Sequence, residues 1–356
     1  MIAPNLRRGG MERQLATFLH GYDRTKLKVT LALFNKDIHY PLPPDISIFD
    51  LNKGRRPDIL FALRLFKLVL NDEFDVINIK ISTISINILW ICGFLRKANV
   101  AIEIRTCGDH LLPFYKAVNR LYKLFKLKWT FICNSKQEYW KAKTSLAPVR
   151  VEFIPNGIDT NRFFKQSFES KASFKIGYVG RILPLKNLET LIKAIALIKP
   201  HKLAINTNIQ LVITGNVDDL TYLERLKILI QNLDLGDSVI FQNSLENVEL
   251  YYSQLNLFVL PSFYEGTPNV LLEAMSCECV CLVSKGANSD NFLSDDFTFD
   301  ILDSAQLAEK IKRILELDDR QINFIGYRNR QYVVDNYSIK NMVENLTSVL
   351  LAQSKQ

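Results

Sequence analysis

The chain has 356 residues, of which 48% are apolar and 23% are charged. This length and composition exclude a collagen-like, a disordered or a disulfide-scaffold protein, and they allow two domains with full hydrophobic cores. The net charge of +8 is uneven, because residues 1–163 carry 26 basic and 14 acidic side chains whereas residues 164–356 carry 19 and 23. A first part of net charge +12 and a second of −4 indicate two surfaces with different partners, the first partner being anionic.

Strand-like apolar runs alternate with helical periods, which is typical of β-α-β units around parallel sheets. In the first half the sequence predicts strands at 28–34, 76–79, 100–104 and 130–134 and helices at 12–22, 57–70 and 114–127. In the second half it predicts strands at 175–180, 210–215, 238–242, 257–260 and 280–284 and helices at 187–198, 220–232, 247–253, 268–276 and 305–316. The predicted fold is α/β, with two doubly wound domains divided near Pro155–Asp159 and a ligand cleft between them.

The beginning of the chain is unusual for a doubly wound domain, because only Ile2, Ala3 and Pro4 form a strand-like run before Gly9–Gly10. We therefore expect the first strand to be truncated. No signal-peptide pattern follows Met1. The longest uncharged run, 81–95, is too short to span a bilayer and is interpreted as buried strand and helix.

The six cysteines follow no secreted framework, which favours a reducing cytosol. Cys277-x-Cys279-x-Cys281 leaves two interpretations, a metal or redox site and a set of small apolar residues entering a buried strand. The second is favoured, because zinc sites usually combine two Cys-x2-Cys pairs.

The segment Pro261–Met275 carries the strongest chemical signal. It follows an apolar strand, and Thr267 and Pro268 suit the N-cap and the first position of a helix. The amides at such a helix N-terminus form an anion site, which Gly266 would let a ligand approach. Glu265 and Glu273 flank this site, and two carboxylates around a phosphate site fit a nucleotide sugar. The alternative is a pair of surface glutamates.

A second segment agrees with the first. The strand near 174–180 leads into Arg181, and Lys186 and Asn187 precede an amphipathic helix for which Asn187 is the predicted N-cap. Arg181 and Lys186 would then project at the carboxyl ends of the strands, where their charges could neutralise a diphosphate leaving group. Taken alone, both residues would be read as surface charges.

These motifs resemble the family 4 retaining nucleotide-sugar glycosyltransferases, which have the GT-B fold. The resemblance rests on Gly180–Arg181, Lys186, Gly215 and the Glu265-x7-Glu273 segment, and on Gly9–Arg13 and Pro155–Asp159. It implies an acceptor domain at 1–160, a donor domain at 161–337, and a C-terminal helix at 338–356 that crosses back to the first domain.

The resemblance also implies a role for each matching residue. Glu273 would bind the ribose hydroxyls, Glu265 the transferred sugar, and Arg181 and Lys186 the diphosphate. Backbone groups of Gly215, Gly266, Thr267 and Asn269 would complete the donor site, with residues 240–243 lining the base pocket. Gly10 would let a loop of the first domain approach the phosphates. His110 is a candidate catalytic residue that would contact the sugar and the acceptor, and Arg105 is a candidate contact for the acceptor or a phosphate; the alternative is solvated loop residues.

Family members retain anomeric configuration and need no metal, and the sequence has no Asp-x-Asp motif. No cofactor is implied, since the nucleotide sugar, for which UDP is the expected nucleotide, is a substrate. The chain departs from the family pattern at Ser276–Cys279 and at Lys285–Asp290. These departures fall on the base or sugar side of the pocket.

Residues 116–150 gather nine basic side chains and a single acid. Lys116, Arg120 and Lys123 share one helical face. This is either a solvated surface or a docking surface for anionic lipid headgroups, with Tyr115, Tyr122 and Trp129 near the interface. Nucleic acid is a less suitable partner, because no nucleic-acid module accompanies the charge.

Together these features predict a retaining, metal-independent glycosyltransferase that moves a sugar from a UDP-sugar to a lipid-linked, lipopolysaccharide- or polysaccharide-type acceptor. We expect a cytoplasmic protein, peripheral on the inner face of the plasma membrane. The alternatives are a nucleotide-sugar epimerase of similar fold and a degenerate nucleotide-sugar-binding partner protein.

Overall fold

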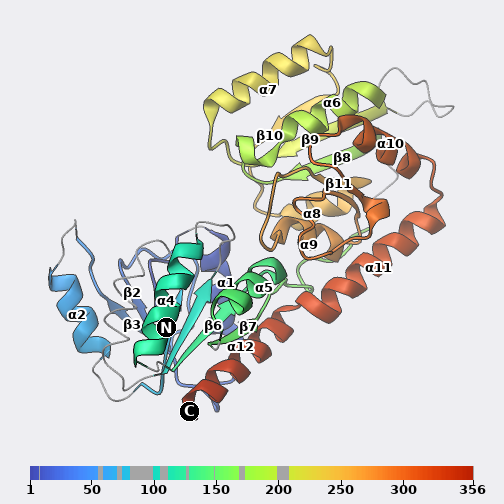
Figure 1. Cartoon of the computed structure of the whole chain (residues 1–356). Coiled ribbons are helices and arrows are strands. Elements are labelled where there is room, and N and C mark those ends of the chain that lie inside the picture. The colour runs from blue at the N-terminus through green and yellow to red at the C-terminus, as the bar shows by residue number, and fades with distance from the viewer. Residues whose placement is uncertain are drawn as a thin grey trace. The chain divides into compact units, whose positions relative to one another are not determined.

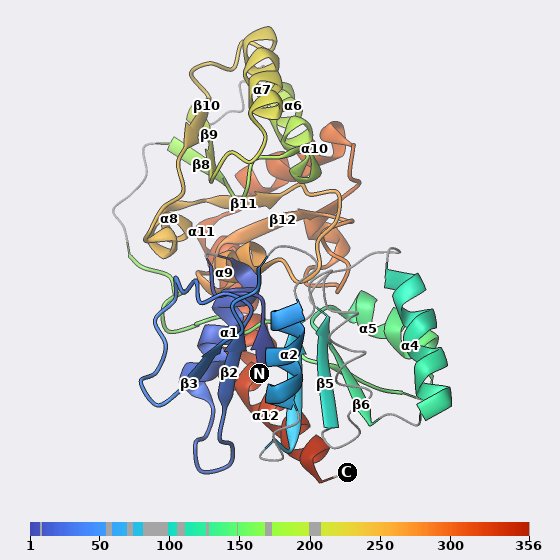
Figure 2. The same cartoon turned by 90° about the vertical axis from the view of Figure 1, so that its left-hand side faces the viewer.

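A computed structural model describes residues 1–7, 9–54, 59–69, 74–80, 99–104, 111–125, 128–147, 149–167, 173–198 and 208–355. The chain divides into two compact units, which we call unit 1 (Met1–Gly157 with Ile339–Gln356) and unit 2 (Ile158–Ser338). The sequence predicts boundaries after 160 and 337, whereas the chain leaves unit 1 at Gly157 and returns at Ile339. Both units are parallel sheets with helices on both faces (Figures 1 and 2).

Unit 1 is built on a seven-stranded sheet with the order β3-β2-β1-β4-β5-β6-β7. Its strands are β1 (Ile2–Ala3), β2 (Thr30–Leu33), β3 (Ser47–Asp50), β4 (Val76–Lys80), β5 (Asn99–Ile104), β6 (Trp129–Cys133) and β7 (Arg150–Phe153). The order reverses between β1 and β4, and the carboxyl ends of strands at such a reversal are where open α/β sheets bind ligands.

Two groups of helices cover this sheet. On one face lie α1 (Gly10–Gly21) and α12 (Ile339–Ser354), whose apolar residues share a core with β1 and β2. On the other face lie α2 (Ile59–Val69), α4 (Leu112–Phe125) and α5 (Lys136–Ser145), which share a second core. This division follows from the right-handed crossovers between parallel strands. The chain moves along the sheet toward β3 through α1 and in the opposite direction, toward β7, through α2, α4 and α5, so the two sets of helices lie on opposite faces.

Unit 2 is built on a six-stranded sheet with the order β10-β9-β8-β11-β12-β13. Its strands are β8 (Ser173–Val179), β9 (Asn208–Thr214), β10 (Val239–Gln242), β11 (Leu257–Leu260), β12 (Val280–Ser284) and β13 (Thr298–Phe299). On one face α6 (Leu188–Ile198) packs against α7 (Leu220–Asn232) and α10 (Ser304–Leu315). On the other, α9 (Asn269–Ser276) packs against α8 (Val248–Gln254) and α11 (Asp319–Tyr337), as Figure 1 shows.

The structure confirms the interpretation of the Cys-x-Cys-x-Cys segment. Cys277, Cys279 and Cys281 are all buried in the core of unit 2, with none disulfide-bonded. Burial raises the pKa of the Cys281 thiol well above its ordinary value, so this sulfur stays protonated and packs as an apolar side chain. Cys92 and Cys107 lie outside the described residues.

The predicted membrane surface is wrong for Tyr115 and Trp129. Tyr115 is fully buried and donates a hydrogen bond to Glu138 of α5, and Trp129 lies buried in β6. Lys116 and Arg120 are exposed on α4, as predicted. The side chains of Tyr122 and Lys123 lie outside the described part of the chain. Among the described residues, no helix combines the length and apolar character that a membrane span requires.

Candidate active site

The carboxyl ends of β8 and β9 meet at two glycines. A Cβ on Gly215 would lie 1.8 Å from the carbonyl oxygen of Gly180, so only glycine allows the two chains this approach. The amide of Gly180 donates to Thr214 O at 3.0 Å, and the Tyr178 hydroxyl donates to Arg181 O at 2.9 Å. The backbone that carries Arg181 is therefore fixed at the end of β8.

The Arg181 side chain projects from this edge into solvent, with 65% of it exposed. Its Nη1 lies 3.0 Å from Oδ2 of Asp218, which follows β9 and is itself 39% exposed. The pair is therefore a surface ion pair, and its Coulomb energy is small in water. A diphosphate with two negative charges could displace Asp218 from Arg181.

Neutralising Asp218 should strengthen nucleoside diphosphate binding. An exposed ion pair contributes about 0.2–1 kcal/mol, so Asp218→Asn should lower the Kd for UDP by about 1.4- to fivefold at low salt. Isothermal titration calorimetry would measure the change. Asp300→Asn is the matched control, because it breaks the similarly exposed Lys285–Asp300 pair and should leave the Kd unchanged. An unchanged or higher Kd for Asp218→Asn would show that Asp218 does not compete for Arg181.

Lys186 ends a single 3-10 turn, Pro184–Lys186, just before α6. Asn187 directly precedes α6, as the predicted N-cap, and its Oδ1 accepts from Thr190 Oγ1 in the first turn of that helix at 2.9 Å. Asn187 takes a left-handed backbone, φ 51°, and its Nδ2 donates to Pro261 O at 3.1 Å and Ile301 O at 2.6 Å. It thus ties the start of α6 to the loop after β11, which brings Lys186 to the Pro261–Met275 segment.

Lys186 and Glu265 form an ion pair in this loop. Lys186 Nζ lies 2.6 Å from Glu265 Oε1, with the two side chains only 12% and 17% exposed. Ser262 Oγ donates to the same oxygen at 2.7 Å. Both contacts use Oε1, so among the described residues no hydrogen bond is made to Oε2, which can accept from a ligand hydroxyl. The sequence predicted both residues but not their pairing.

The helix after this loop begins one residue later than predicted. Pro268, not Thr267, occupies the N-cap position, and α9 starts at Asn269. Pro268 has no side-chain acceptor for the first amides, and its carbonyl accepts from Leu271 N at 3.0 Å and Leu272 N at 3.2 Å. The turn through Gly266 and Thr267 therefore still leads into a helix N-terminus, whose dipole favours an anion.

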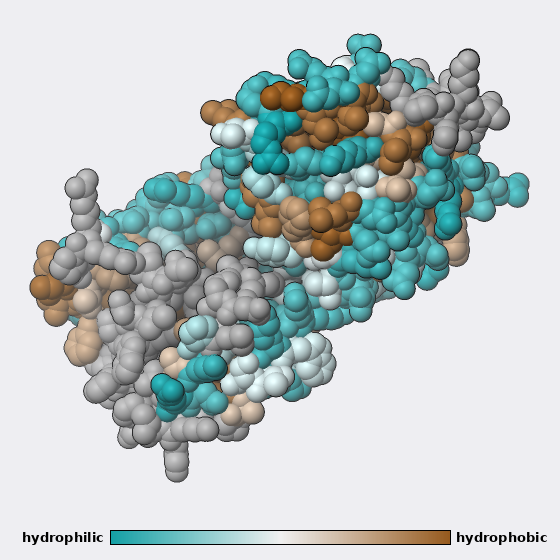
Figure 3. Space-filling model, turned by 45° about the horizontal axis from the view of Figure 1, so that its top comes forward, coloured by the Kyte–Doolittle hydropathy of each residue, from teal (hydrophilic) through white to brown (hydrophobic). Residues whose placement is uncertain are grey.

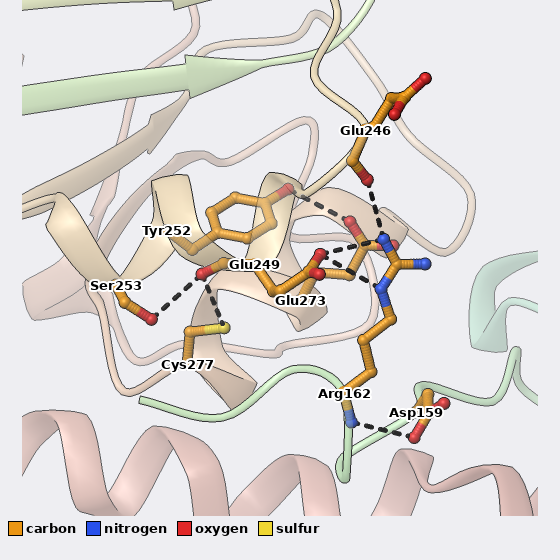
Figure 4. A network of polar contacts seen from close by, with 8 residues as sticks. All are labelled: Asp159, Arg162, Glu246, Glu249, Tyr252, Ser253, Glu273 and Cys277. Carbon is orange, nitrogen blue, oxygen red and sulfur yellow. Dashed lines mark hydrogen bonds and ion pairs between the residues drawn. The ribbon is translucent and has the colours of Figure 1, made fainter. Parts of the chain in front are cut away.

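Glu273 lies on α9 one turn from its start and is 3% exposed. The Tyr252 hydroxyl of α8 points at its carboxylate and donates to Oε2 at 3.2 Å (Figure 4). Burial, followed by the Glu273 charge, raises the pKa of Tyr252 well above its ordinary value, so the phenol stays a donor at all physiological pH values. Tyr252 lies 21 residues from Glu273 in sequence, and nothing in the sequence marked it.

Arg162 fixes α8, the helix that carries Tyr252. As Figure 4 shows, its guanidinium reaches Glu249, with Nη2 and Nε at 2.9 and 3.1 Å from Oε2, and Nη2 also donates to Glu246 O at 3.0 Å. The segment holding Arg162 is itself turned by Asp159, whose Oδ1 accepts from Arg162 N at 3.1 Å. The position of Glu273 thus depends on residues far outside its own motif.

An open groove of about 770 Å³ lies beside α8 in unit 2. Its floor is formed by residues of β8, β9 and β10, including Ile240, Phe241 and Gln242 of the predicted base pocket. Leu250 and Tyr251 of α8 form one wall, and the Tyr251 hydroxyl donates to Val212 O at 2.8 Å. The groove has the size of a small-ligand site.

The other three predicted residues come from the first part of the chain. Gly10 is the first residue of α1 in unit 1. Arg105 and His110 lie outside the described residues, so their roles stay predictions.

Comparison with known proteins agrees with this geometry. The family model described as Glycosyltransferase Family 4 matches residues 8–162, and the model described as Glycosyl transferases group 1 matches residues 159–331. Together they span both units. The chain belongs to glycosyltransferase family 4. The predicted family is confirmed.

Curated relatives of this glycosyltransferase match most of its length. It is 27% identical over 332 residues to the N-acetylgalactosamine-N,N'-diacetylbacillosaminyl-diphospho-undecaprenol 4-alpha-N-acetylgalactosaminyltransferase of Campylobacter jejuni, covering 87% of this chain and 88% of the relative. It is 26% identical over 325 residues to the UDP-Gal:alpha-D-GlcNAc-diphosphoundecaprenol alpha-1,3-galactosyltransferase of Escherichia coli, covering 83% and 79%.

Solved structures share the fold. Anabaena HepE in complex with UDP superposes with a TM-score of 0.80 at 17% identity, covering 99% of this glycosyltransferase and 98% of HepE. WaaG, a glycosyltransferase involved in lipopolysaccharide biosynthesis, superposes with a TM-score of 0.70 at 13% identity, covering 98% of each chain. The predicted GT-B fold is confirmed.

Proposed function

We propose that this glycosyltransferase moves a sugar, with retention of anomeric configuration and without a metal ion, from a UDP-sugar to a lipid-linked or polysaccharide-type acceptor at the cytoplasmic face of the plasma membrane. The observation that carries the donor side is the Lys186–Glu265 pair at 2.6 Å, which joins a cation to a carboxylate at the start of α9. The acceptor class is supported by the relatives from C. jejuni and E. coli, whose names specify undecaprenol-linked diphospho-sugars. UDP is supported by HepE, which has been solved with UDP and with UDP-glucose.

In this proposal the donor lies along the carboxyl edge of the unit 2 sheet. Arg181 and Lys186 neutralise the diphosphate, and Gly215 keeps the neighbouring backbone close to it. Glu265 accepts from sugar hydroxyls through Oε2, and Glu273 accepts from the ribose hydroxyls. The amides of Gly266, Thr267 and Asn269 face the phosphates at the start of α9.

The proposed reaction needs positioning and charge rather than a protein nucleophile. The bond between the anomeric carbon and the phosphate oxygen breaks while the acceptor oxygen bonds to that carbon from the same face. The acceptor proton passes to the departing phosphate oxygen. The negative charge that develops on the diphosphate is stabilised by Arg181, Lys186 and the positive end of α9.

Unit 1 is proposed to hold the acceptor. Gly10 would let the start of α1 approach the donor phosphates, and His110 and Arg105 would contact the sugar, the acceptor or a phosphate. Lys116, Arg120 and Lys123 of α4 would face the anionic membrane surface.

Loss of the Glu273 carboxylate should weaken UDP binding strongly. Hydrogen bonds to a charged group contribute about 1.5–3 kcal/mol, so Glu273→Gln should weaken UDP by about 10- to 100-fold and remove the thermal shift that UDP gives the wild type. Glu189→Gln is the matched control, because Glu189 of α6 also accepts a hydrogen bond from a tyrosine hydroxyl, that of Tyr222 on α7. This variant should keep the UDP thermal shift of the wild type. A full UDP shift in Glu273→Gln would refute the assigned pocket.

Transfer itself can be followed with radiolabelled UDP-sugars and membrane extract, with and without EDTA. The proposal predicts label in the lipid fraction that EDTA does not reduce, with the anomeric linkage of the donor preserved. Label released only as free sugar, or an inverted linkage, would contradict it.

A further inference from the structure

The outer face of α2 carries an unusual group of exposed apolar side chains. Ile59, Leu60, Leu63 and Phe66 are 72%, 62%, 58% and 44% exposed, and Figure 3 shows brown side chains gathered over α2 at the left of the view. The inner face is apolar as well, since Phe61 and Leu65 are buried in the core of unit 1. Folding of unit 1 therefore leaves one apolar face of α2 in water, which favours burial in another environment.

A basic row adjoins this apolar row. Ile59, Leu63 and Phe66 follow one another at helical spacing, and Leu60, Arg64 and Lys67 form the next row. Residues 59–69 include no acid. The Arg64 guanidinium donates to Leu51 O at 3.1 Å and Asn52 O at 3.0 Å, which anchors its charge beside the apolar row. A helix with adjoining apolar and basic rows suits the boundary between lipid headgroups and acyl chains.

The neighbouring helices extend the same chemistry. α4 and α5 cover the same face of the sheet as α2, with Lys116 and Arg120 exposed on α4. Trp140 of α5 is 60% exposed, and Lys143 Nζ lies 5.1 Å from the centre of its ring. An exposed tryptophan beside lysines is typical of side chains at a membrane interface.

We propose that this face of unit 1, the exposed residues of α2, α4 and α5, docks on an anionic bilayer, and that α2 inserts Ile59, Leu60, Leu63 and Phe66 among the headgroups. The positive charge of the face selects anionic lipid, and the apolar row supplies the contact that charge alone cannot. The inference rests on the proposed function insofar as a lipid-linked acceptor lies in that bilayer. It differs from the sequence-based prediction, because the inserting element is α2 and not the aromatic residues near α4.

The test is vesicle flotation with phosphatidylcholine vesicles, with or without phosphatidylglycerol. We expect the wild type to bind only the anionic vesicles, less strongly as salt rises, and Leu63→Ser/Phe66→Ser to bind them at least tenfold more weakly. The matched control is Leu220→Ser/Ile228→Ser on α7 of unit 2. The Leu220 and Ile228 side chains are 73% and 55% exposed, and this double variant should bind the vesicles as the wild type does. Equal binding by the two double variants would overturn the proposal.

A second measurement does not depend on loss of binding. In Phe66→Trp, the tryptophan fluorescence that remains after subtraction of the wild-type spectrum should shift to shorter wavelength when anionic vesicles are added. The absence of this shift would overturn the proposed insertion of α2. A third outcome would also overturn the proposal: the wild type forms dimers and does not bind vesicles, and Leu63→Ser/Phe66→Ser is monomeric. This face of unit 1 would then be the interface with a second copy of the chain. The UDP thermal shift of each variant separates the two proposals: vesicle binding without any UDP shift would contradict the proposed function alone.

Discussion

Replacing Lys186 with methionine should lower kcat by about 10²- to 10³-fold, the range found when one preorganised charge-stabilising group is removed from an active site. Lys186 is 12% exposed, so in the proposed reaction its charge would act on the departing diphosphate with little screening by water. Because the charge acts most strongly as the diphosphate leaves, KM should change much less than kcat. Steady-state transfer rates at saturating UDP-sugar measure the effect.

The same substitution leaves Glu265 without its cation, so its effect on folding has to be separated from its effect on catalysis. Thermal unfolding of Lys186→Met and of Lys186→Met/Glu265→Gln should show whether the unpaired carboxylate destabilises unit 2. Lys227→Met is the matched control, since it breaks the exposed Lys227–Glu224 pair of α7 and should keep the wild-type kcat. A kcat within threefold of wild type in a folded Lys186→Met enzyme would exclude the assigned role.

Glu103→Leu should lower the free energy of unfolding of unit 1 by about 3–5 kcal/mol, because it leaves the Lys80 ammonium buried without its carboxylate. Lys80 Nζ lies 2.6 Å from Glu103 Oε2, and the two side chains are 1% and 0% exposed on neighbouring strands β4 and β5. Lys80→Met/Glu103→Leu should recover most of the loss, since an apolar pair of similar volume needs no counter-charge.

Urea unfolding followed by tryptophan fluorescence reports on unit 1 by itself, because the three tryptophans are residues 90, 129 and 140. Asp37→Asn is the control in the same unit, where it breaks the exposed Arg7–Asp37 pair and should cost less than about 1 kcal/mol. A loss in Glu103→Leu no larger than in this control would mean that the buried pair does not stabilise unit 1.

The sequence predicted the buried central strands well and missed the two edge strands of the unit 1 sheet. β5, β6, β11 and β12 are almost wholly buried and read as continuous apolar runs. β3 and β7 are edge strands of the unit 1 sheet with mostly exposed or half-buried residues, so their sequences lack this signal and they were not predicted. α11 was not predicted either, because most of its 19 residues are polar. Its capping box of Asp318 and Gln321 was nevertheless a helix signal available in the sequence.

The predicted donor residues are local features, which is why the sequence alone could propose them. Arg181, Lys186, Glu265 and Glu273 each lie in a loop or first helical turns directly after a buried strand, and such loops meet at one edge of a parallel sheet. Their partners could not be found in this way. Asp218, Ser262 and Tyr252 reach them by side-chain contacts that only the packing of α8, α9 and the strand ends creates.

By itself, then, the sequence determined two α/β units and a family, and it singled out four charged residues as predicted donor contacts, because strand periodicity and loop motifs are properties of neighbouring residues. Only the tertiary structure decided how these residues pair, Lys186 with Glu265 across 79 positions of sequence and Glu273 with Tyr252 across 21. It also decided which apolar faces stay in water. α2 is apolar on both faces, so its sequence cannot say which one meets the sheet, and packing buries Phe61 and Leu65 while Leu63 and Phe66 remain exposed.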